Sequence, residues 1–303
     1  MASHNEMPKL LSLNDGRTLC YQTYGALHGI PVFLFHGFPG CRLQAALIQE
    51  QAKAANICLI AFDRPGFGLS DPHPQRSILG VADDVVQLAD HLGHAQFGLI
   101  GVSCGGAYAM ATAVQLPDRV NHVSLVAGIG PMTIPAIREQ QLPVLKVMFS
   151  LARLHRWLAA PLLLPDWLLF RSSADRAVRV LSALLSEPDR ALLNTDAAAF
   201  ALFGASLAEA YRQGPRGAML EASLIARDRG FELEQISQTV DVHQAGVDRH
   251  VPLAMGQHIA QSIPLGQLHL HTEEGHLSIL VNKATEILRR FQPAPTSLSL
   301  NSR

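Results

Sequence analysis

The sequence predicts an α/β fold built on a mostly parallel, doubly wound sheet. Four short runs are rich in Val, Ile, Leu and Phe and do not alternate with polar residues: PVFLF (31–35), ICLIAF (57–62), FGLIGV (97–102) and HVSLVAG (122–128). Strands of this kind suit a parallel sheet, because helices cover both of its faces. Segments with helical spacing lie between the runs, and this alternation of strand and helix is typical of a doubly wound sheet.

Two local patterns support this prediction. In SILGVADDVVQLADHLG the apolar residues fall on one helical stripe, Ser77 suits the N-cap, and Gly93 suits the C-terminal stop. The N-terminal stretch LLSLNDGRTLCYQTYG (10–25) is different, because an Asp15-Gly16 turn separates two strand-like runs. It predicts an antiparallel hairpin at the edge of the sheet.

The pattern changes between residues 131 and 238. Strand-like runs disappear there and helix formers dominate, interrupted by prolines, which predicts a helical insertion. We therefore divide the chain into a core of residues 1–130 and 239–303 and a helical cap of residues 131–238.

Strand and helix return after the insertion. The order is TVDVHQ (239–244), a helix from about Val251, GQLHLH (266–271), and a last helix from about Gly275 to Phe291. The tail PAPTSLSLNSR (293–303) is predicted to be disordered.

Composition excludes several classes of partner. The 303 residues carry a formal net charge of −1, so no electrostatic field favours nucleic acid. The N-terminus lacks the pattern of a signal peptide, and charges and prolines interrupt the most apolar stretch (142–170). No window there offers the roughly 20 apolar residues of a membrane span. We therefore expect a cytoplasmic protein. Cys20, Cys41, Cys58 and Cys104 show no CxxC spacing, and three of them lie in or beside apolar or glycine-rich runs, as is common for reduced thiols.

The run GVSCGGA places two potential nucleophiles, Ser103 and Cys104, between an apolar strand and a good helix. A nucleophile on such a sharp turn has a strained backbone that requires small residues two positions away on either side. Around Ser103 those positions are Gly101 and Gly105, whereas Cys104 would have the bulky Val102 on one side. The steric argument selects Ser103, although the five-residue pattern alone also fits a structural turn.

Two further glycine-rich segments follow predicted strands. HGFPG (36–40) is suited to direct main-chain N–H groups at a developing oxyanion, or to serve as a plain strand-to-helix connection. DRPGFGLSD (63–71) is interpreted as a tight turn in which Asp63 is structural.

These three segments, in this order and strand context, closely resemble the α/β-hydrolase superfamily. The resemblance extends from Leu10 to about Arg290 and is weakest across residues 131–238. It implies the α/β-hydrolase fold with a helical cap. It also implies that the nucleophile is followed along the chain by an acid and then by a histidine.

The resemblance indicates where the acid and the histidine lie. Asp248 in VDVHQAGVDRHVP occupies the position of a Gly-x-x-Asp loop ahead of Val-Pro, with Ala245 in place of the usual first glycine. Asp241 is the competing acid, but it lies inside the predicted strand. His276, directly after Gly275, has the expected place between the last strand and the last helix.

Together these residues imply a serine hydrolase that cleaves a small-molecule carboxylic ester through an acyl-enzyme intermediate. His276 takes the proton of Ser103, and Asp248 fixes the tautomer of the imidazole. The main-chain N–H groups of Phe38 and Cys104 hold the oxyanion. This chemistry requires no cofactor and no metal.

Other activities stay open at this point. Cofactor-free perhydrolases and carbon–carbon bond hydrolases retain a Ser-Asp-His set, whereas epoxide hydrolases and haloalkane dehalogenases carry Asp where this chain has Ser103. An aminopeptidase would need carboxylates in the cap, such as Glu209 and Glu221. A ligand-binding receptor on a hydrolase scaffold is a further alternative.

The cap and the remaining histidines give weaker signals. Met148 and Trp157 are predicted to line an acyl pocket, but apolar cap residues are equally suited to pack on the core or to join two subunits into a homodimer. His269 and His271 alternate on a strand without matching cysteine or carboxylate spacing, so we predict no metal site.

Overall fold

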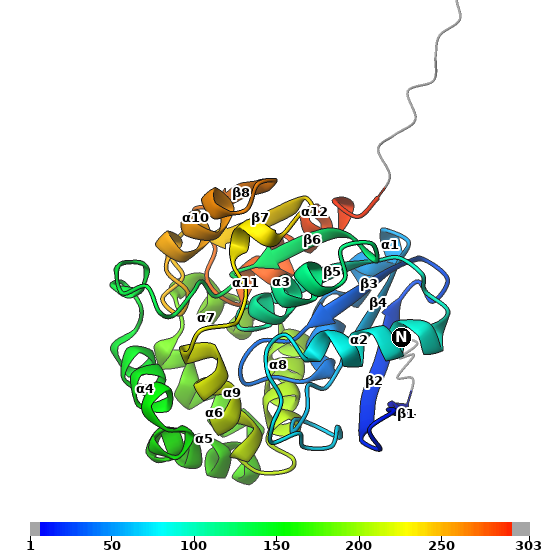
Figure 1. The fold of residues 1–303 in the computed structure, drawn as a ribbon. Coiled ribbons are helices and arrows are strands. Elements are labelled where there is room, and N and C mark those ends of the chain that lie inside the picture. Colours follow the sequence, from blue (N-terminus) through cyan, green and yellow to red (C-terminus); the bar gives the residue numbers. More distant parts are fainter. Residues whose placement is uncertain (1–6, 293–303) are drawn as a thin grey trace, which may run out of the picture.

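The computed structural model describes residues 7–292, so the predicted tail lies outside the described residues. Its eight strands form one sheet in the order β1-β2-β4-β3-β5-β6-β7-β8, with β1 and β8 at opposite edges (Figure 1). Strand β2 pairs antiparallel with β1 and β4, and every other pair is parallel. The strands are β1 (Lys9–Ser12), β2 (Thr18–Gly25), β3 (Ile30–Phe35), β4 (Ile57–Phe62), β5 (Phe97–Val102), β6 (Val120–Val126), β7 (Val240–Ala245) and β8 (Gly266–His271).

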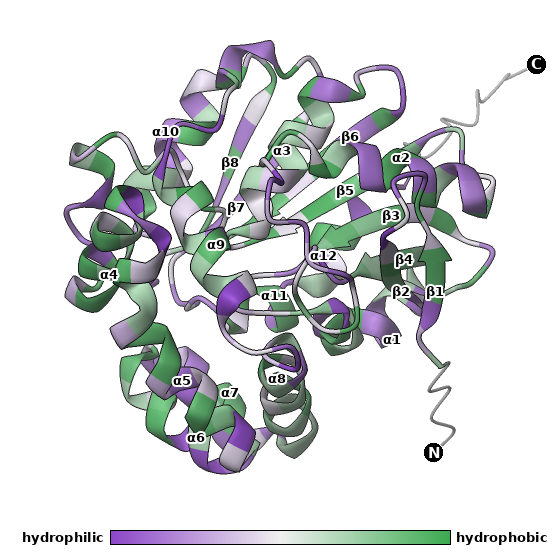
Figure 2. Cartoon of the chain, turned by 60° about the horizontal axis from the view of Figure 1, so that its bottom comes forward, coloured by the Kyte–Doolittle hydropathy of each residue, from purple (hydrophilic) through white to green (hydrophobic). Residues whose placement is uncertain are grey.

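The central strands are buried on both faces, as continuous apolar runs require. Every residue of β4 and β5 is buried. Along β3, Phe33 packs into one hydrophobic core, whereas Val32 and Leu34 pack into the core on the opposite face, because side chains alternate along a strand. Figure 2 shows the centre of the sheet as its most hydrophobic part. The predicted fold class and the hairpin at the sheet edge are confirmed.

Helices cover both faces of the sheet. Side chains of α2, α3 and α10 belong to the core on one face, and those of α1, α11 and α12 belong to the core on the other face. A 3₁₀ helix, η1, precedes α1. The bounds are η1 (Arg42–Ile48), α1 (Gln49–Ala54), α2 (Val81–Leu92), α3 (Gly105–Gln115), α10 (Leu253–Ser262), α11 (Ser278–Asn282) and α12 (Ala284–Arg289).

Two predicted helix boundaries were wrong. Helix α2 begins at Val81 rather than after Ser77, whose hydroxyl instead accepts a hydrogen bond from the N–H of Gly80 in the preceding turn. Its end is as predicted, since Gly93 takes a left-handed φ of 77°. The last helix is divided into α11 and α12, with Lys283 between them outside helical geometry.

The chain between β6 and β7 is helical, and residues 131–238 contain no strand. In Figure 1 these helices, coloured green to yellow, gather on one side of the sheet. Their bounds are η2 (Ala136–Arg138), α4 (Pro143–Leu154), η3 (Arg156–Ala159), α5 (Ala160–Ser172), α6 (Ala174–Leu181), η4 (Ser182–Leu184), α7 (Glu187–Thr195), α8 (Ala197–Ala210), α9 (Arg216–Ala226) and η5 (Leu233–Gln235). We refer to residues 131–238 as the insertion.

Within residues 7–292 no single helix has the length and apolar character needed to cross a membrane. Helices α7 and α8 meet both criteria only when taken together, and they are bent by 108° relative to each other. All four cysteines are free and buried.

Candidate active site

Ser103 lies on a sharp turn between β5 and α3. Its φ is +54°, in the left-handed region that side chains rarely adopt. A Cβ atom on Gly101 would lie 2.6 Å from the Cα atom of Gly106, and one on Gly105 would lie 2.1 Å from the carbonyl oxygen of Phe35. Both flanking positions therefore require glycine. The backbone agrees with the steric argument that centres this turn on Ser103.

The structure brings Ser103, His276 and Asp248 together from the loops that follow β5, β8 and β7. The Nε2 atom of His276 lies 3.0 Å from the Oγ atom of Ser103, and its Nδ1 atom lies 2.7 Å from an Asp248 carboxylate oxygen. The other oxygen of Asp248 accepts hydrogen bonds from the N–H groups of His250 and Val251. Because a carboxylate only accepts, Nδ1 carries the proton, and Nε2 is left to accept from the serine hydroxyl.

The surroundings of His276 shift the pKa of its imidazole. Burial disfavours its charged form, but the charge and the hydrogen bond of Asp248 outweigh this effect and raise the pKa of His276 above its ordinary value. The ring of His250 stacks on that of His276 with centroids 4.8 Å apart. Burial and the nearby charge of His276 lower the pKa of His250 to about 4. Sequence reasoning missed His250, although it lies only two residues after Asp248.

The segments predicted to form an oxyanion site lie beside Ser103. Phe38 and Cys104 both line the cavity that contains Ser103. Among the described residues, no hydrogen bond uses the main-chain N–H of Phe38 or of Cys104. Arg64 holds the 36–40 loop from behind, because its guanidinium donates to the carbonyl oxygens of His36 and Gly37.

The thiol of Cys104 is poorly suited to act as a nucleophile. Burial, reinforced by the negative charge of Glu221, raises the pKa of Cys104 to about 12. The thiolate form is therefore strongly disfavoured at neutral pH, and the thiolate is the reactive species of cysteine.

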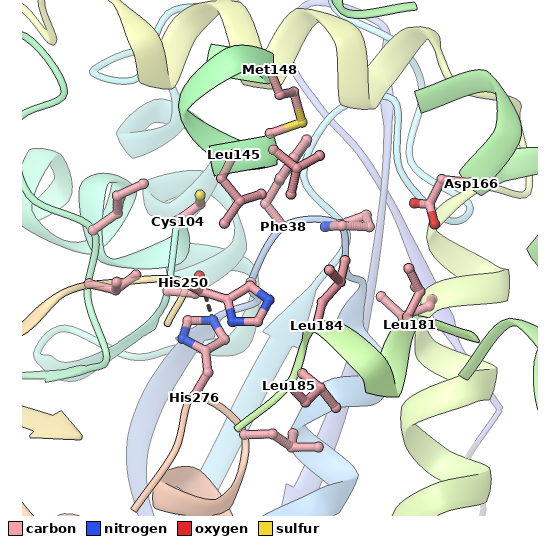
Figure 3. Close-up of a pocket in the computed structure, with 18 of the residues that line it drawn as sticks. Phe38, Cys104, Leu145, Met148, Asp166, Leu181, Leu184, Leu185, His250 and His276 are labelled. Carbon is pink, nitrogen blue, oxygen red and sulfur yellow. Dashed lines mark hydrogen bonds between the residues drawn. The ribbon is translucent and has the colours of Figure 1, made fainter. Parts of the chain in front are cut away.

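A cavity of about 420 Å³ opens in front of Ser103, between the sheet and the insertion (Figure 3). Its wall is mostly apolar and includes Met148. Trp157 does not line it: this side chain in η3 is 47% exposed and has the guanidinium of Arg156 over its ring. Other lining residues come from α4, α5, α6, η4, α8 and the loops. They include Leu145, Phe149, Leu163, Leu169, Leu181, Leu184, Leu185, Phe203 and Leu207.

Asp166 is the acidic side chain in the lining of this cavity. One of its oxygens accepts a hydrogen bond from the hydroxyl of Tyr211 at 2.6 Å, and the other has no hydrogen-bond partner within residues 7–292. Burial raises the pKa of Asp166. In Figure 3 Asp166 lies at the far side of the cavity from His276.

The two cap carboxylates considered at the sequence level lie elsewhere. Glu221 is fully buried and binds the guanidinium groups of Arg64 and Arg76 and the hydroxyl of Tyr108. Glu209 pairs with two arginines, Arg42 of η1 and Arg212. Neither side chain lines the cavity.

Asp241, the competing acid, has other partners. One of its oxygens lies 2.6 Å from Nε2 of His269 and the other lies 3.0 Å from Nε2 of His122. Burial opposes ionisation of this carboxyl, but the contacts with His122 and His269 lower the pKa of Asp241 to about 2.

Two groups of described residues have the ligand types and proximity for a metal ion. The ligand atoms of His243, His271 and Glu286 lie within 4.8 Å of one another, and the same is true of Asp248, His250 and His276. The second group already contains the hydrogen bond from His276 to Asp248. Imidazole and carboxylate are ligands of many divalent metals, so neither group selects one ion.

Comparison with known proteins finds similarity over part of the chain. A family model described as alpha/beta hydrolase fold matches residues 30–170. The dihydrolipoyllysine-residue acetyltransferase component of the acetoin cleaving system of Pseudomonas putida is 32% identical over 189 residues, which are 58% of this chain and 50% of that protein. The proline iminopeptidase of Xanthomonas citri is 31% identical over 124 residues, 39% of this chain and 38% of that protein. The chain thus spans half or less of the length of these relatives.

Solved structures extend the likeness over nearly the whole chain. A thermophilic esterase from Thermogutta terrifontis superposes with a TM-score of 0.68 at 21% identity, covering 94% of this chain and 97% of that one. At this identity the likeness is one of fold. Taken with the family model and the eight-stranded sheet, it shows that this chain has the α/β-hydrolase fold.

Proposed function

We propose that the protein is a serine hydrolase that cleaves carboxylic esters through an acyl-enzyme intermediate. The observation that carries the proposal is the chain of hydrogen bonds from Ser103 through His276 to Asp248 at the wall of an apolar cavity. A serine hydroxyl is a weak nucleophile unaided, and an imidazole within hydrogen-bond distance is the group that activates it.

The geometry supports a two-stage reaction. Ser103 Oγ attacks the ester carbonyl carbon as its proton passes to Nε2 of His276, and the N–H groups of Phe38 and Cys104 hold the oxyanion. The intermediate collapses, the carbon–oxygen bond to the alcohol breaks, and His276 returns the proton to the departing oxygen. Water then attacks the acyl-enzyme, gives a proton to His276, and releases the carboxylic acid as Ser103 recovers its proton.

The cavity wall supports an ester with an apolar acyl group rather than an aminoacyl substrate. A substrate ammonium needs a charged carboxylate, and both Glu209 and Glu221 are engaged by arginines outside the cavity. Asp166 does line the cavity, but one of its oxygens already accepts from the hydroxyl of Tyr211, and burial raises its pKa. An acyl chain would instead displace water from leucine, methionine and phenylalanine side chains.

The test combines labelling with turnover. A fluorophosphonate should label the intact protein once, and peptide mapping should place the label on Ser103. The labelled protein should lose its turnover of p-nitrophenyl butyrate, while aminoacyl p-nitroanilides should be poor substrates for the unlabelled protein. Absence of labelling in folded protein, or turnover of the aminoacyl amides alone, contradicts the proposal.

A further inference from the structure

A second buried carboxylate contacts the loop that carries His276, and it comes from the insertion. Asp189 lies in α7 and is fully buried. One oxygen accepts a hydrogen bond from the main-chain N–H of His276 at 3.0 Å, and the other accepts from Leu277 and Ser278, both at 2.9 Å. The hydroxyl of Ser186 donates to the first oxygen at 2.8 Å. Asp189 thus binds three consecutive N–H groups, beginning at the histidine itself.

The loop is pressed closely against this carboxylate. A Cβ atom on Gly275 would lie 1.9 Å from the Oγ atom of Ser186 and 2.5 Å from a carboxylate oxygen of Asp189. The N–H of Gly275 donates to the hydroxyl of Ser278, which closes the turn from within. Any side chain at position 275 would therefore separate the histidine loop from α7.

Asp189 is held in its charged form. Burial opposes ionisation, but hydrogen bonds from the Ser278 N–H and the Ser186 hydroxyl, together with the charge of His276, lower the pKa of Asp189. The groups that face His276 are the carboxylates of Asp248 and Asp189 and the neutral, stacked ring of His250. Two negative charges therefore act on the imidazole from different elements, and the charge of Asp189 contributes to the raised pKa of His276.

We propose that Asp189 is a positioning residue for His276, through which the insertion fixes the main chain of the histidine loop and so the distance from Nε2 to Ser103. The inference rests on the proposed function. Asp189 touches neither Ser103 nor the reacting atoms, and it acts through main-chain N–H groups and through its charge. Packing of the insertion against the core therefore also sets the position of His276.

The test is the full-length Asp189→Asn variant. Its amide keeps one acceptor oxygen but turns an N–H₂ group toward loop N–H groups and removes the charge. At equal active-site concentration, we expect kcat for p-nitrophenyl butyrate to fall roughly 10–100-fold, with KM changed less than about threefold, because misplacement of a reacting group by about 1 Å costs this much. The rate of fluorophosphonate labelling should fall in parallel, and the pKa of His276 should decrease. Imidazole NMR measures that pKa without any substrate, with the signal assigned by its loss in His276→Asn.

Glu209→Gln is the matched control, because it also converts a carboxylate of the insertion that binds the core, here Arg42, without contacting the histidine loop. It should lower only thermal stability. A folded Asp189→Asn variant with wild-type labelling rate and wild-type His276 titration overturns the inference. If that variant does not fold, Ser186→Ala removes only the hydroxyl that orients the carboxylate. Ser186→Ala should then lower both the rate of fluorophosphonate labelling and the pKa of His276. If neither quantity changes, the inference is overturned. A wild-type protein that neither labels nor hydrolyses esters contradicts the proposed function alone, since the NMR titration still reports on Asp189.

Discussion

The carboxylate of Asp248 lies 2.7 Å from Nδ1 of His276, on the opposite side of the ring from the nitrogen that faces Ser103. Two main-chain N–H groups hold the second carboxylate oxygen, so the side chain has a fixed direction. Asp241, only seven residues earlier in the chain, points instead at His122 and His269. The two carboxylates therefore have different partners, because Asp241 lies within β7 and Asp248 lies in the loop that follows it.

Exchange of each carboxylate for an amide tests this assignment. Asp248→Asn should lower kcat by roughly 10⁴-fold, because the amide stabilises the wrong tautomer of His276. Asp241→Asn should leave kcat within about threefold of wild type, and should lower stability through the lost histidine contacts. Steady-state kinetics and thermal unfolding of both variants measure these effects. A crippled Asp241→Asn enzyme beside a nearly normal Asp248→Asn enzyme would reverse the assignment.

Substitution of the neighbouring nucleophile candidates distinguishes serine from cysteine chemistry. Ser103→Ala should retain only trace turnover, because no other group in the turn can form the acyl-enzyme. Cys104→Ala keeps the main-chain N–H and removes only the buried thiol, so it should retain most of the activity. Turnover of p-nitrophenyl butyrate and labelling by a thiol reagent give the readouts. An active Ser103→Ala enzyme with an inactive, folded Cys104→Ala enzyme would overturn the serine mechanism.

The pH dependence should report on His276. Only the neutral imidazole accepts the serine proton, so kcat/KM should fall as the pH decreases through the pKa of His276. Because that pKa is raised, the acid limb should lie above the ordinary histidine value of 6.5. His250, with a pKa of about 4, stays neutral through this range. Rates measured from about pH 5 to 9 at constant ionic strength locate the limb. A limb below the ordinary histidine value disagrees with the hydrogen bond to Asp248.

Acyl chain-length preference should depend on Met148 and not on Trp157. Met148→Phe places a stiffer, larger side chain in the cavity wall, so kcat/KM for octanoyl esters should fall about 10-fold relative to acetyl esters. Trp157→Ala is the control in the insertion, because this exposed side chain lies outside the cavity, and its profile should equal that of wild type. A panel of p-nitrophenyl esters from acetyl to decanoyl measures both profiles. A changed profile in Trp157→Ala alone would place the acyl chain outside the cavity.

Local sequence was sufficient for the sheet and for the turn at Ser103. Four uninterrupted apolar runs predicted buried parallel strands, because a strand covered on both faces has no polar side. Small residues at 101 and 105 predicted the sharp turn, because the contacts that exclude a Cβ atom there are inherent to a strand-to-helix turn of this kind. The helix boundaries at Ser77 and Lys283 were missed, because they depend on hydrogen bonds and packing with neighbouring segments.

Tertiary structure alone decided what surrounds the histidine and the cavity. Asp189 and His276 are 87 residues apart in the chain, and no motif links a helix of the insertion to three N–H groups of a distant loop. Met148 and Trp157 are both large apolar residues in the same part of the insertion, yet of the two only Met148 lines the cavity. Local steric contacts and the hydrophobic pattern depend on residues that are adjacent in the sequence, so both can be predicted from it. The direction of a side chain depends on how whole helices dock, and that follows from contacts between segments far apart in the sequence.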